Sequence, residues 1–541
     1  MAKRGQVQPS EAEYVVVGAG SAGAAVAARL AQAGHSVILL EAGGKASSMA
    51  FRKPGMIAMI HSDPKLKGMF DWGYYHAPQK HMLDRKIPAT RGKLLGGSSS
   101  VNGMIFVRGN KANFDSWEAE GNTGWGYDDV LATYKKMENW EGGASDYRGA
   151  GGPVQVIENH DVAEASRQFV AAGASALGLE PTADYNGAQQ EGMHIIQEST
   201  RDAVRYSTWE AYLATPPEGL SVQTGATVAK VVLQGARATG VEIIDKAGRR
   251  VIRASKEVIL SAGAYASPHL LMLSGIGPAG HLSDHGIGVV ADLPVGDNFH
   301  DHLFVPLTFE MNNLKHRGTA PYFARNVAKE LRRSGSTFLA HSVFEAGAFT
   351  RTEWAQGEAP DLQLLALPWA YPSPNQDAPV RHKVHTKPSL SIFSATVQPR
   401  SRGTIRLNSA DPTDAPVIDP QFLSEREDLE VLVRGMEMIR EAMNDPAIRG
   451  NVLREVHPGP SYSNEALREE VLNRATTVYH PVGSCRMGVD DAAVVGPDLK
   501  VRGIEGLRVA DASIMPSIIS GNTNAPSIMI GEKCAELVLG R

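Results

Sequence analysis

The stretch YVVVGAGSAGAAVAARLAQAGHSVILLE, residues 14–41, contains the clearest indication of the fold of this protein. It begins with a short apolar run, which predicts a buried strand. Three glycines, Gly18, Gly20 and Gly23, follow at G-x-G-x-x-G spacing. After them come a helix rich in small residues and a second apolar strand that ends at Glu41. This order of elements is typical of a Rossmann-like α/β domain with a parallel sheet.

The same order predicts what the glycine turn binds. Glycines permit a close approach of the backbone, and the helix N-terminus presents N–H groups to a pyrophosphate. Glu41, 18 residues after Gly23, can accept hydrogen bonds from an adenosine ribose, and its charge would repel a 2′-phosphate. The stretch therefore predicts a dinucleotide other than NADP and leaves NAD and FAD open.

Two further glycine-bearing segments bear on that choice. One is GKLLGGSSSVNGMIFVRGNKANFD, residues 92–115, and the other is GAYASPHLLMLSGIG, residues 263–277. In the first, the run from Gly96 to Ser99 offers backbone N–H groups and hydroxyls that suit a phosphate or the edge of a flat ring. Both segments resemble the signature patterns of the glucose–methanol–choline (GMC) family of FAD-dependent oxidoreductases, and choline-dehydrogenase-like alcohol dehydrogenases and oxidases in particular.

The resemblance extends over nearly the whole chain. Other segments similar to the family are GNTGWGYDDVLATYKKME (121–138), STWEAYL (207–213), VGDNFHDHL (295–303), QPRSRGTIRLNSADP (398–412), HPVGSCRMG (480–488) and GLRVADASIMPSIISGNTNAPSIMIGEKCAE (506–536). The resemblance implies an α/β fold with a Rossmann-like FAD-binding domain, and an enzyme that carries FAD and oxidises an alcohol to the aldehyde.

Applied residue by residue, the resemblance implies where FAD lies. Its adenine end is expected at the glycine turn and Glu41, with the backbone of Val228 against the adenine. The isoalloxazine is expected against Asn102–Ile105. Asp511, which ends the apolar strand of GLRVADAS, would hydrogen-bond the ribityl chain or orient the loop around it. The expected cofactor-binding residues are Gly18, Gly20, Ser21, Ala22, Gly23, Glu41, Ala42, Leu95, Gly97, Ser98, Asn102, Gly103, Met104, Ile105, Val228, Asp511, Ala512, Asn522 and Thr523.

The residue before Asn102 bears on how the cofactor is held. Some GMC members attach FAD covalently through a histidine next to the asparagine of the first signature. Here that position is Val101, whose side chain has no nucleophilic atom. We therefore expect non-covalent, dissociable FAD.

Composition restricts the class of partner. The formal net charge of −5 and the lack of a dense basic run argue against a nucleic-acid-binding protein. Two cysteines, Cys485 and Cys534, provide no disulfide framework and no CxxC pair. The polar N-terminus MAKRGQVQPSEAE lacks the apolar core of a secretory signal. These features predict a cytoplasmic protein.

A chain of 541 residues exceeds the usual size of a single core, so we expect two domains. By resemblance, residues 1–160, 220–305 and 475–541 form a discontinuous FAD-binding domain. Residues 161–219 and 306–474 form a substrate-binding domain on a mostly antiparallel sheet.

Two segments raise the question of membrane contact. VILSAGAYASPHLLMLSGIG, residues 258–277, has twenty residues without a formal charge. Pro268 and several small turn residues nevertheless predict a buried strand, a loop and a short helix, not a membrane span.

Residues 312–335 carry many basic side chains. They leave open an amphipathic lid, a peripheral contact with the membrane surface, or a solvated helix and loop that covers the active-site entrance, and we favour the last.

The stretch VYHPVGSCRMG, residues 478–488, allows three interpretations. A metal site is disfavoured because Pro481 prevents a simple helix between His480 and Cys485, and HDH at residues 300–302 is interpreted as a structural turn. We expect no metal. A Cys485 nucleophile would need a positioned base and an acyl substrate. The third interpretation, acid–base chemistry beside a flavin, agrees with the other motifs.

By resemblance, His480 is the catalytic histidine and Asn524, in GNTNAP, is its partner. Flavin N5 takes the hydride of the alcohol, and the protein must supply the base. Imidazole has an ordinary pKa of about 6.5, whereas asparagine cannot act as a base near neutral pH. His480 is thus expected to take the hydroxyl proton, and Asn524 to donate a hydrogen bond to the developing alkoxide.

We expect a primary aliphatic or aryl alcohol as the substrate. Choline-like alcohols and polyols are the less favoured alternatives. Trp369 and Tyr371 could line its pocket or pack in the core. Electrons would pass on to O2 or to a quinone-type acceptor. Two alternatives stay open: a non-redox, FAD-containing lyase that splits cyanohydrins, and a flavin-binding module without activity.

Overall fold

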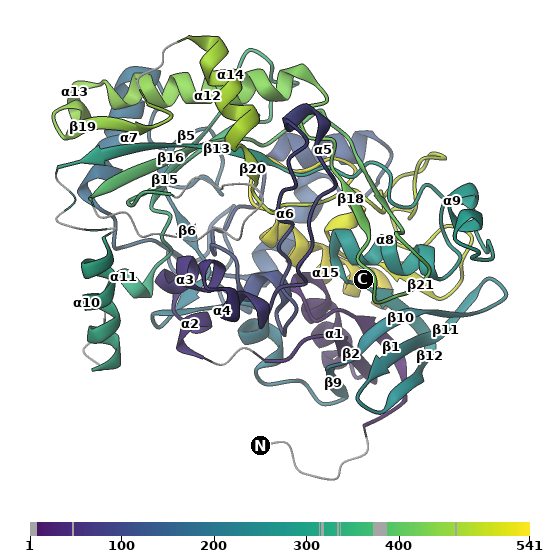
Figure 1. The fold of residues 1–541 in the computed structure, drawn as a ribbon. Coiled ribbons are helices and arrows are strands. Elements are labelled where there is room, and N and C mark those ends of the chain that lie inside the picture. Colours follow the sequence, from purple (N-terminus) through teal and green to yellow (C-terminus); the bar gives the residue numbers. More distant parts are fainter. Residues whose placement is uncertain are drawn as a thin grey trace.

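Two sheets of different kinds organise the chain (Figure 1). The computed structural model describes residues 8–45, 48–312, 314, 317, 319–332, 335, 337–371, 387–459 and 463–541. Within these residues one sheet is mainly parallel and the other is antiparallel. The α/β class with a Rossmann-like domain, expected from residues 14–41, is confirmed.

The mainly parallel sheet has the strand order β10-β11-β12-β1-β2-β9, and β21 also pairs with β12. Its strands are β1 (Glu11–Val17), β2 (Val37–Glu41), β9 (Leu220–Thr224), β10 (Thr227–Gln234), β11 (Arg237–Asp245), β12 (Gly248–Leu260) and β21 (Leu507–Val509). β1 lies between β2 and β12, parallel to both. The antiparallel β10 and β11 extend one edge.

Small residues let two helices approach this sheet and each other closely. α1 (Ser21–Gln32) and α15 (Asn524–Leu539) pack side by side at the centre of Figure 1. A Cβ on Gly531 would lie 2.4 Å from the backbone oxygen of Ala22, so only glycine fits this crossing. Neighbouring helices are α5 (Lys111–Ala119), α6 (Tyr127–Met137) and α8 (Gly263–Leu273).

The second sheet is antiparallel throughout its described pairs, in the order β19-β13-β16-β15-β14-β5, with β20 also paired to β13. Its strands are β5 (Gly192–Ile195), β13 (Leu303–Met311), β14 (Ala346–Thr350), β15 (Leu362–Leu367), β16 (Ser389–Thr396), β19 (Val452–His457) and β20 (Thr476–Thr477). The expectation of a mostly antiparallel second sheet is confirmed.

Successive side chains of this sheet point to opposite faces and join two different cores. Leu303, Val305 and Leu364 pack in a cluster with α7 (Glu164–Leu177), α12 (Arg426–Met443) and α14 (Asn464–Arg474), which cover the upper face in Figure 1. Phe304, Leu365 and Phe393 belong to another cluster on the opposite face. That second face is the one turned toward the mainly parallel sheet.

Three segments depart from the expected domain boundaries. β13 runs across the boundary set at residue 305, and β20 pairs with β13 although it was assigned to the FAD-binding part. The segment Trp209–Leu213, assigned to the substrate-binding part, packs on α1, and Tyr212 donates a hydrogen bond of 2.6 Å to Glu532 of α15. Strand pairing and helix contacts place these segments, and the order of the sequence alone does not predict them.

The remaining described elements lie outside the two large sheets and the helices named above. They are α2 (Met49–Arg52), α3 (Ile57–Ser62), α4 (Pro64–Gly68), α9 (Ala279–Asp284), α10 (Ala320–Leu331), α11 (Thr337–Ala340), α13 (Pro446–Arg449), β3 (Glu138–Trp140), β4 (Val154–Glu158), β6 (Gln197–Glu198), β7 (Thr200–Arg201), β8 (Val204–Arg205), β17 (Thr404–Arg406), β18 (Val417–Asp419), and the 3-10 turns Pro54–Met56, Lys80–Met82, Gly97–Ser100 and Ala512–Ile514. Residues 258–277 form the end of β12, a turn and α8, as expected. In the described part of the chain no helix is long and apolar enough to cross a membrane.

Candidate active site

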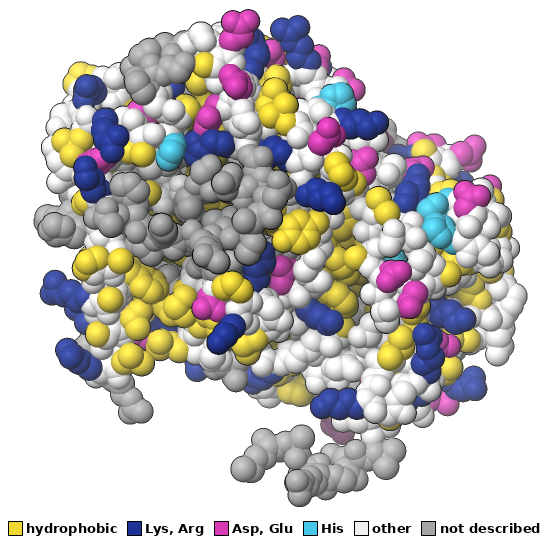
Figure 2. Space-filling model, viewed as in Figure 1, with side chains coloured by type: hydrophobic (Ala, Val, Ile, Leu, Met, Phe, Trp, Pro, Cys, Tyr) yellow, Lys and Arg dark blue, Asp and Glu magenta, His cyan; other side chains and the backbone are white. Residues whose placement is uncertain are grey.

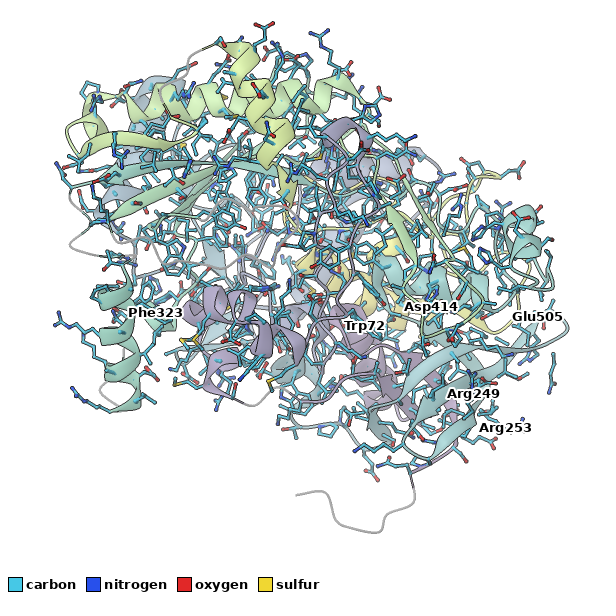
Figure 3. The ribbon with its side chains drawn as sticks, viewed as in Figure 1. Trp72, Arg249, Arg253, Phe323, Asp414 and Glu505 are labelled. Atoms are coloured by element: carbon cyan, nitrogen blue, oxygen red, sulfur yellow. The ribbon has the colours of Figure 1, made fainter. Side chains whose placement is uncertain are left out.

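A cavity of about 1080 Å³ lies between the two sheets. In Figure 3 its lining residues Trp72, Phe323 and Asp414 mark three walls that come from distant parts of the chain. Most of the residues expected to bind cofactor or substrate line it. These are Gly18, Gly20, Ser21, Ala22, Glu41, Ala42, Gly97, Ser98, Asn102, Gly103, Met104, Ile105, Val228, Trp369, Tyr371, His480, Asp511, Ala512, Asn522, Thr523 and Asn524.

Two expected cofactor contacts lie outside this lining. A Cβ on Gly23 would lie 1.9 Å from the backbone oxygen of Gly18, so this glycine serves the packing of α1 on the turn. Leu95 is buried in the core beside the turn, and its backbone N–H donates to the carbonyl of Gly44 at 2.9 Å. Both residues support the glycine-rich loops from behind.

The N-terminus of α1 opens into the cavity with its charge uncompensated. No side chain within the described ranges caps it, and its first turn contains no acidic residue. Gly97 comes so close that a Cβ on it would lie 2.8 Å from Cα of Gly20. Free N–H groups, a partial positive charge and two bare glycines form a cradle that fits a pyrophosphate.

Glu41 lies at the end of β2 beside this cradle. Its carboxylate accepts hydrogen bonds from the backbone N–H groups of Ala19 at 3.1 Å and Gly43 at 2.8 Å. Burial nevertheless raises the pKa of Glu41 to about 7, against these amides and Lys93, which lower it. A ribose whose hydroxyls donate to this carboxylate would stabilise its charged form.

Two further expected residues shape the loops around the middle of the cavity. Oδ1 of Asn102 accepts from the backbone N–H of Met104 at 3.0 Å and from Nη1 of Arg205 at 2.9 Å. Asp511 accepts from the N–H of Gly263 at 2.8 Å and from the hydroxyl of Ser267 at 2.5 Å. These bonds hold the start of α8 beside Asp511, and the expected roles of Asp511 toward FAD stay predictions.

His480 is held at the far end of the cavity by its backbone. Its N–H donates to Oδ1 of Asp301 at 2.7 Å, and the hydroxyl of Thr477 donates to Oδ2 of the same carboxylate at 2.6 Å. The preceding carbonyl, that of Tyr479, accepts from Nη2 of Arg91 at 2.6 Å. Burial raises the pKa of Asp301 to about 6, opposed mainly by Thr477 and Arg91.

Both ring nitrogens of His480 have partners. Nδ1 lies 3.0 Å from Nδ1 of His302, and Nε2 lies 3.2 Å from Nδ2 of Asn522. Burial holds the pKa of His480 well below its usual value, and the nearby His302 and Arg91 act in the same direction. His480 is therefore neutral near pH 7, as a base must be before it takes a proton.

The asparagine beside His480 is not the one expected. Asn524 is the first residue of α15, and its Oδ1 accepts a hydrogen bond of 2.7 Å from the hydroxyl of Ser21 at the start of α1. The pairing of Asn524 with His480 is wrong, because the chain turns into the helix between the two asparagines and directs their side chains apart. Asn522 was expected only as a cofactor contact.

The HDH stretch, interpreted as a structural turn, contains a residue of the site. His300 does serve the backbone: its Nδ1 lies 2.6 Å from the oxygen of Asn298, and its Nε2 accepts from Ile518 N–H at 3.0 Å. His302 reaches His480. The His300 backbone bonds reciprocally with Val482, which places the two segments side by side. The position of His302 beside His480 depends on this tertiary contact and could not be predicted from the sequence.

The other interpretations of residues 478–488 find no geometry to support them. In the described residues no group of three or more histidine, cysteine, aspartate or glutamate side chains is placed to hold a metal ion. Cys485 is fully buried outside the cavity lining, and burial raises the pKa of its thiol well above the usual value. A thiolate nucleophile is not available there.

Aromatic side chains of the antiparallel sheet form the wall near His480. Phe304 and Phe393 stack with their ring centroids 4.6 Å apart, and Tyr371 meets Phe393 edge-on at 4.9 Å. Phe344 packs on the same ring at 5.7 Å. Trp369 also faces the cavity. The rings contact one another and leave an apolar wall.

The described part of the basic segment 312–335 covers the same end. α10 places Tyr322 and Phe323 in the cavity lining, and both rings contact Phe338 of α11. Lys53 and Glu330 form an ion pair of 2.6 Å that ties α10 to the neighbouring segment. Hydrophobic side chains gather around α10 at the lower left of Figure 2. The segment contributes to the cavity wall, as the interpretation of a covered entrance requires.

The sequence matches one enzyme family over most of its length. Residues 12–304 and 399–531 match the sequence models of the N- and C-terminal parts of GMC oxidoreductases, and the chain belongs to this family. It is a FAD-dependent enzyme that acts on CH–OH donors. The uncapped helix, the bare glycines and Glu41 fit this cofactor.

Named relatives cover almost the whole chain. The alcohol dehydrogenase (acceptor) of Pseudomonas putida is 38% identical over 540 residues, which are 97% of this chain and 95% of its own. The oxygen-dependent choline dehydrogenase of Rhizobium johnstonii is 39% identical, with 98% and 96% covered.

Solved structures show the same fold. The pyridoxine 4-oxidase from Mesorbium loti superposes with a TM-score of 0.85 at 28% identity, covering 98% of this chain and 99% of that one. A formate oxidase of Aspergillus oryzae gives a TM-score of 0.88 at 26% identity, with 99% of both chains covered.

Proposed function

We propose that the protein oxidises a primary aliphatic or aryl alcohol to the aldehyde, with His480 as the base. The observation that carries this proposal is a neutral, buried imidazole whose Nε2 lies beside the amide of Asn522 in the lining of the cavity. Bound flavin supplies the acceptor for the hydride. The alcohol loses its hydroxyl proton to Nε2 of His480 and a hydride from the adjacent carbon, which leaves the aldehyde.

Each neighbouring residue has a defined part in this step. Nδ2 of Asn522 would also donate to the substrate oxygen as its negative charge develops. Its Oδ1 is buried and has no partner among the described residues. Asp301 keeps the His480 backbone in place.

The aromatic wall supports an uncharged substrate. Phe304 covers one face of Phe393, and Tyr371 and Phe344 pack against the same ring. A quaternary ammonium binds best to open ring faces, often with a carboxylate nearby. The packed rings favour an apolar aliphatic or aryl group, although some relatives are named choline dehydrogenases.

The test is anaerobic mixing of the flavin-loaded protein with a panel of alkyl and aryl alcohols and choline. We expect an apolar alcohol to bleach the flavin and choline to do so weakly. Admission of O2 and then of a quinone identifies the acceptor. His480→Ala should retain its yellow colour and lose the reduction. Equal reduction in this variant across pH 6 to 9 would contradict the role of His480, and a flavin that no alcohol bleaches would favour the lyase.

A further inference from the structure

His302 contacts the proposed base from the side opposite the cavity. It is fully buried and does not itself line the cavity. One ring nitrogen, Nδ1, lies 3.0 Å from Nδ1 of His480, and the other, Nε2, lies 3.0 Å from the backbone oxygen of Val397. The two imidazole rings are nearly perpendicular, with an interplanar angle of 87°.

These contacts decide which nitrogen carries each proton. A carbonyl oxygen only accepts, so Nε2 of His302 must carry a hydrogen to bond Val397. Burial lowers the pKa of His302 to about 3, although backbone carbonyls of Val397 and Ile519 raise it, so the ring is neutral and has only one N–H. Its Nδ1 is then an acceptor. The hydrogen between the two rings must come from Nδ1 of His480.

We propose that His302 is a positioning residue that fixes His480 in the tautomer protonated at Nδ1, which leaves the lone pair of Nε2 facing the cavity. The chain of hydrogen bonds runs from His480 to His302 and ends on Val397. If His302 carried its hydrogen on Nδ1 instead, its Nε2 and the Val397 oxygen would be two buried acceptors only 3.0 Å apart, which is unfavourable. The partner of one ring nitrogen thus determines the state of the other.

The consequence for the reaction rests on the proposed role of His480. A base that carried its hydrogen on Nε2 could not accept a proton from the alcohol at that atom. The contact of Asn522 supports this assignment. Its Nδ2 is a donor, so it can form a hydrogen bond to Nε2 of His480 only if that nitrogen carries no hydrogen.

Two substitutions separate the two bonds of His302. In His302→Asn, Oδ1 takes the place of Nδ1 and can still accept from His480, but the donor to Val397 is lost. In His302→Gln, the amide reaches the place of Nε2 and can donate to Val397, but the acceptor for His480 is lost. His81→Asn, at an exposed position, is the control.

Ring-15N NMR of the flavin-loaded protein reads the tautomer without any turnover. The chain has 17 histidines, and the His480 signals are those that disappear in His480→Gln. We expect a protonated Nδ1 and an unprotonated Nε2 at neutral pH, retained in His302→Asn and mixed in His302→Gln. Flavin reduction by substrate should fall about 100-fold in His302→Gln and only a few-fold in His302→Asn.

The outcomes are distinct. A wild-type His480 protonated at Nε2 would overturn the inference, even if His302→Gln failed to fold. Unchanged reduction and an unchanged tautomer in a folded His302→Gln would overturn it as well. The expected tautomer combined with full activity of His480→Ala would leave the positioning intact and reject the proposed function.

Discussion

Nδ2 of Asn522 lies 3.2 Å from Nε2 of His480, whereas the side chain of Asn524, two residues later, bonds Ser21. The two asparagines of GNTNAP therefore belong to different parts of the site. One faces the reacting end, and the other ties the start of α15 to the start of α1 at the pyrophosphate cradle.

Alanine at these two positions should separate catalysis from cofactor binding. Asn522→Ala removes a donor beside the developing alkoxide and should slow flavin reduction about 100-fold. Asn524→Ala loses the bond to Ser21, and its effect should appear as faster release of FAD. Stopped-flow reduction and a FAD-release assay on both variants check this, and a larger loss of reduction rate in Asn524→Ala would restore the original pairing.

The cofactor should dissociate when the protein is denatured. Val101 lines the cavity next to Asn102 and offers no atom for a covalent bond to the flavin. After acid precipitation we expect the yellow colour in the supernatant. A yellow pellet would contradict this prediction.

Binding of FAD to the apoprotein should weaken as the pH falls through 7. Burial raises the pKa of Glu41 to about 7. A charged carboxylate accepts hydrogen bonds from the ribose hydroxyls with both oxygens, whereas the protonated form accepts them less well. The protonated form below this pKa binds less well, with a limiting slope of about tenfold per pH unit. Quenching of FAD fluorescence measures the affinity. In Glu41→Gln the affinity should be lower and its pH dependence should vanish, and a slope that survives would assign it to another group.

Gly23 and Gly20 should respond differently to alanine. A Cβ on Gly23 would meet the Gly18 oxygen at 1.9 Å, so Gly23→Ala should destabilise the apoprotein by about 3 kcal/mol or more. Among the described residues, a Cβ on Gly20 would meet no atom closer than Cα of Gly97, at 4.0 Å. Gly20→Ala should therefore unfold like the wild type but bind FAD more weakly. Thermal unfolding without cofactor distinguishes the two.

Flavin reduction should stay fast below the ordinary pKa of histidine, about 6.5. Burial, His302 and Arg91 hold the pKa of His480 down, and the carboxylate of Asp301 accepts from the backbone N–H of His480, not from its ring. The neutral base therefore persists as the pH falls, and its loss begins only well below 6.5. A stopped-flow pH profile tests this; a rate that halves near pH 6.5 would refute it.

The cofactor end of the site was predictable because its determinants are local. A strand, three glycines, a helix of small residues and Glu41 lie within one stretch, and each constrains its neighbours through backbone geometry. Trp369 and Tyr371 were named as either pocket or core residues, and the structure gives them both functions: they line the cavity and pack on the cluster of Phe393.

The reacting end was harder, since it depends on contacts between distant segments. HDH at residues 300–302 has the spacing of many metal and turn motifs, and only the pairing of His300 with Val482 brings His302 to His480. Asn522 and Asn524 are separated by two positions in a segment where an irregular turn becomes a helix. No periodicity extends across such a change, so their directions could not be predicted.

The pairing of β21 with β12 has a consequence for biosynthesis. Val258–Leu260 can pair with Leu507–Val509 only after those residues have left the ribosome, about 250 residues later. At a translation speed of about 5 to 20 residues per second, this delay is on the order of tens of seconds. During that time the edge of β12 at Val258–Leu260 has no β21 partner, although β1 already pairs with these residues, and the cradle lacks the turn of Asp511 and the helix of Asn524. The cradle is therefore complete only after residues 507–539 have been synthesised, so we expect FAD to bind late in synthesis or after it.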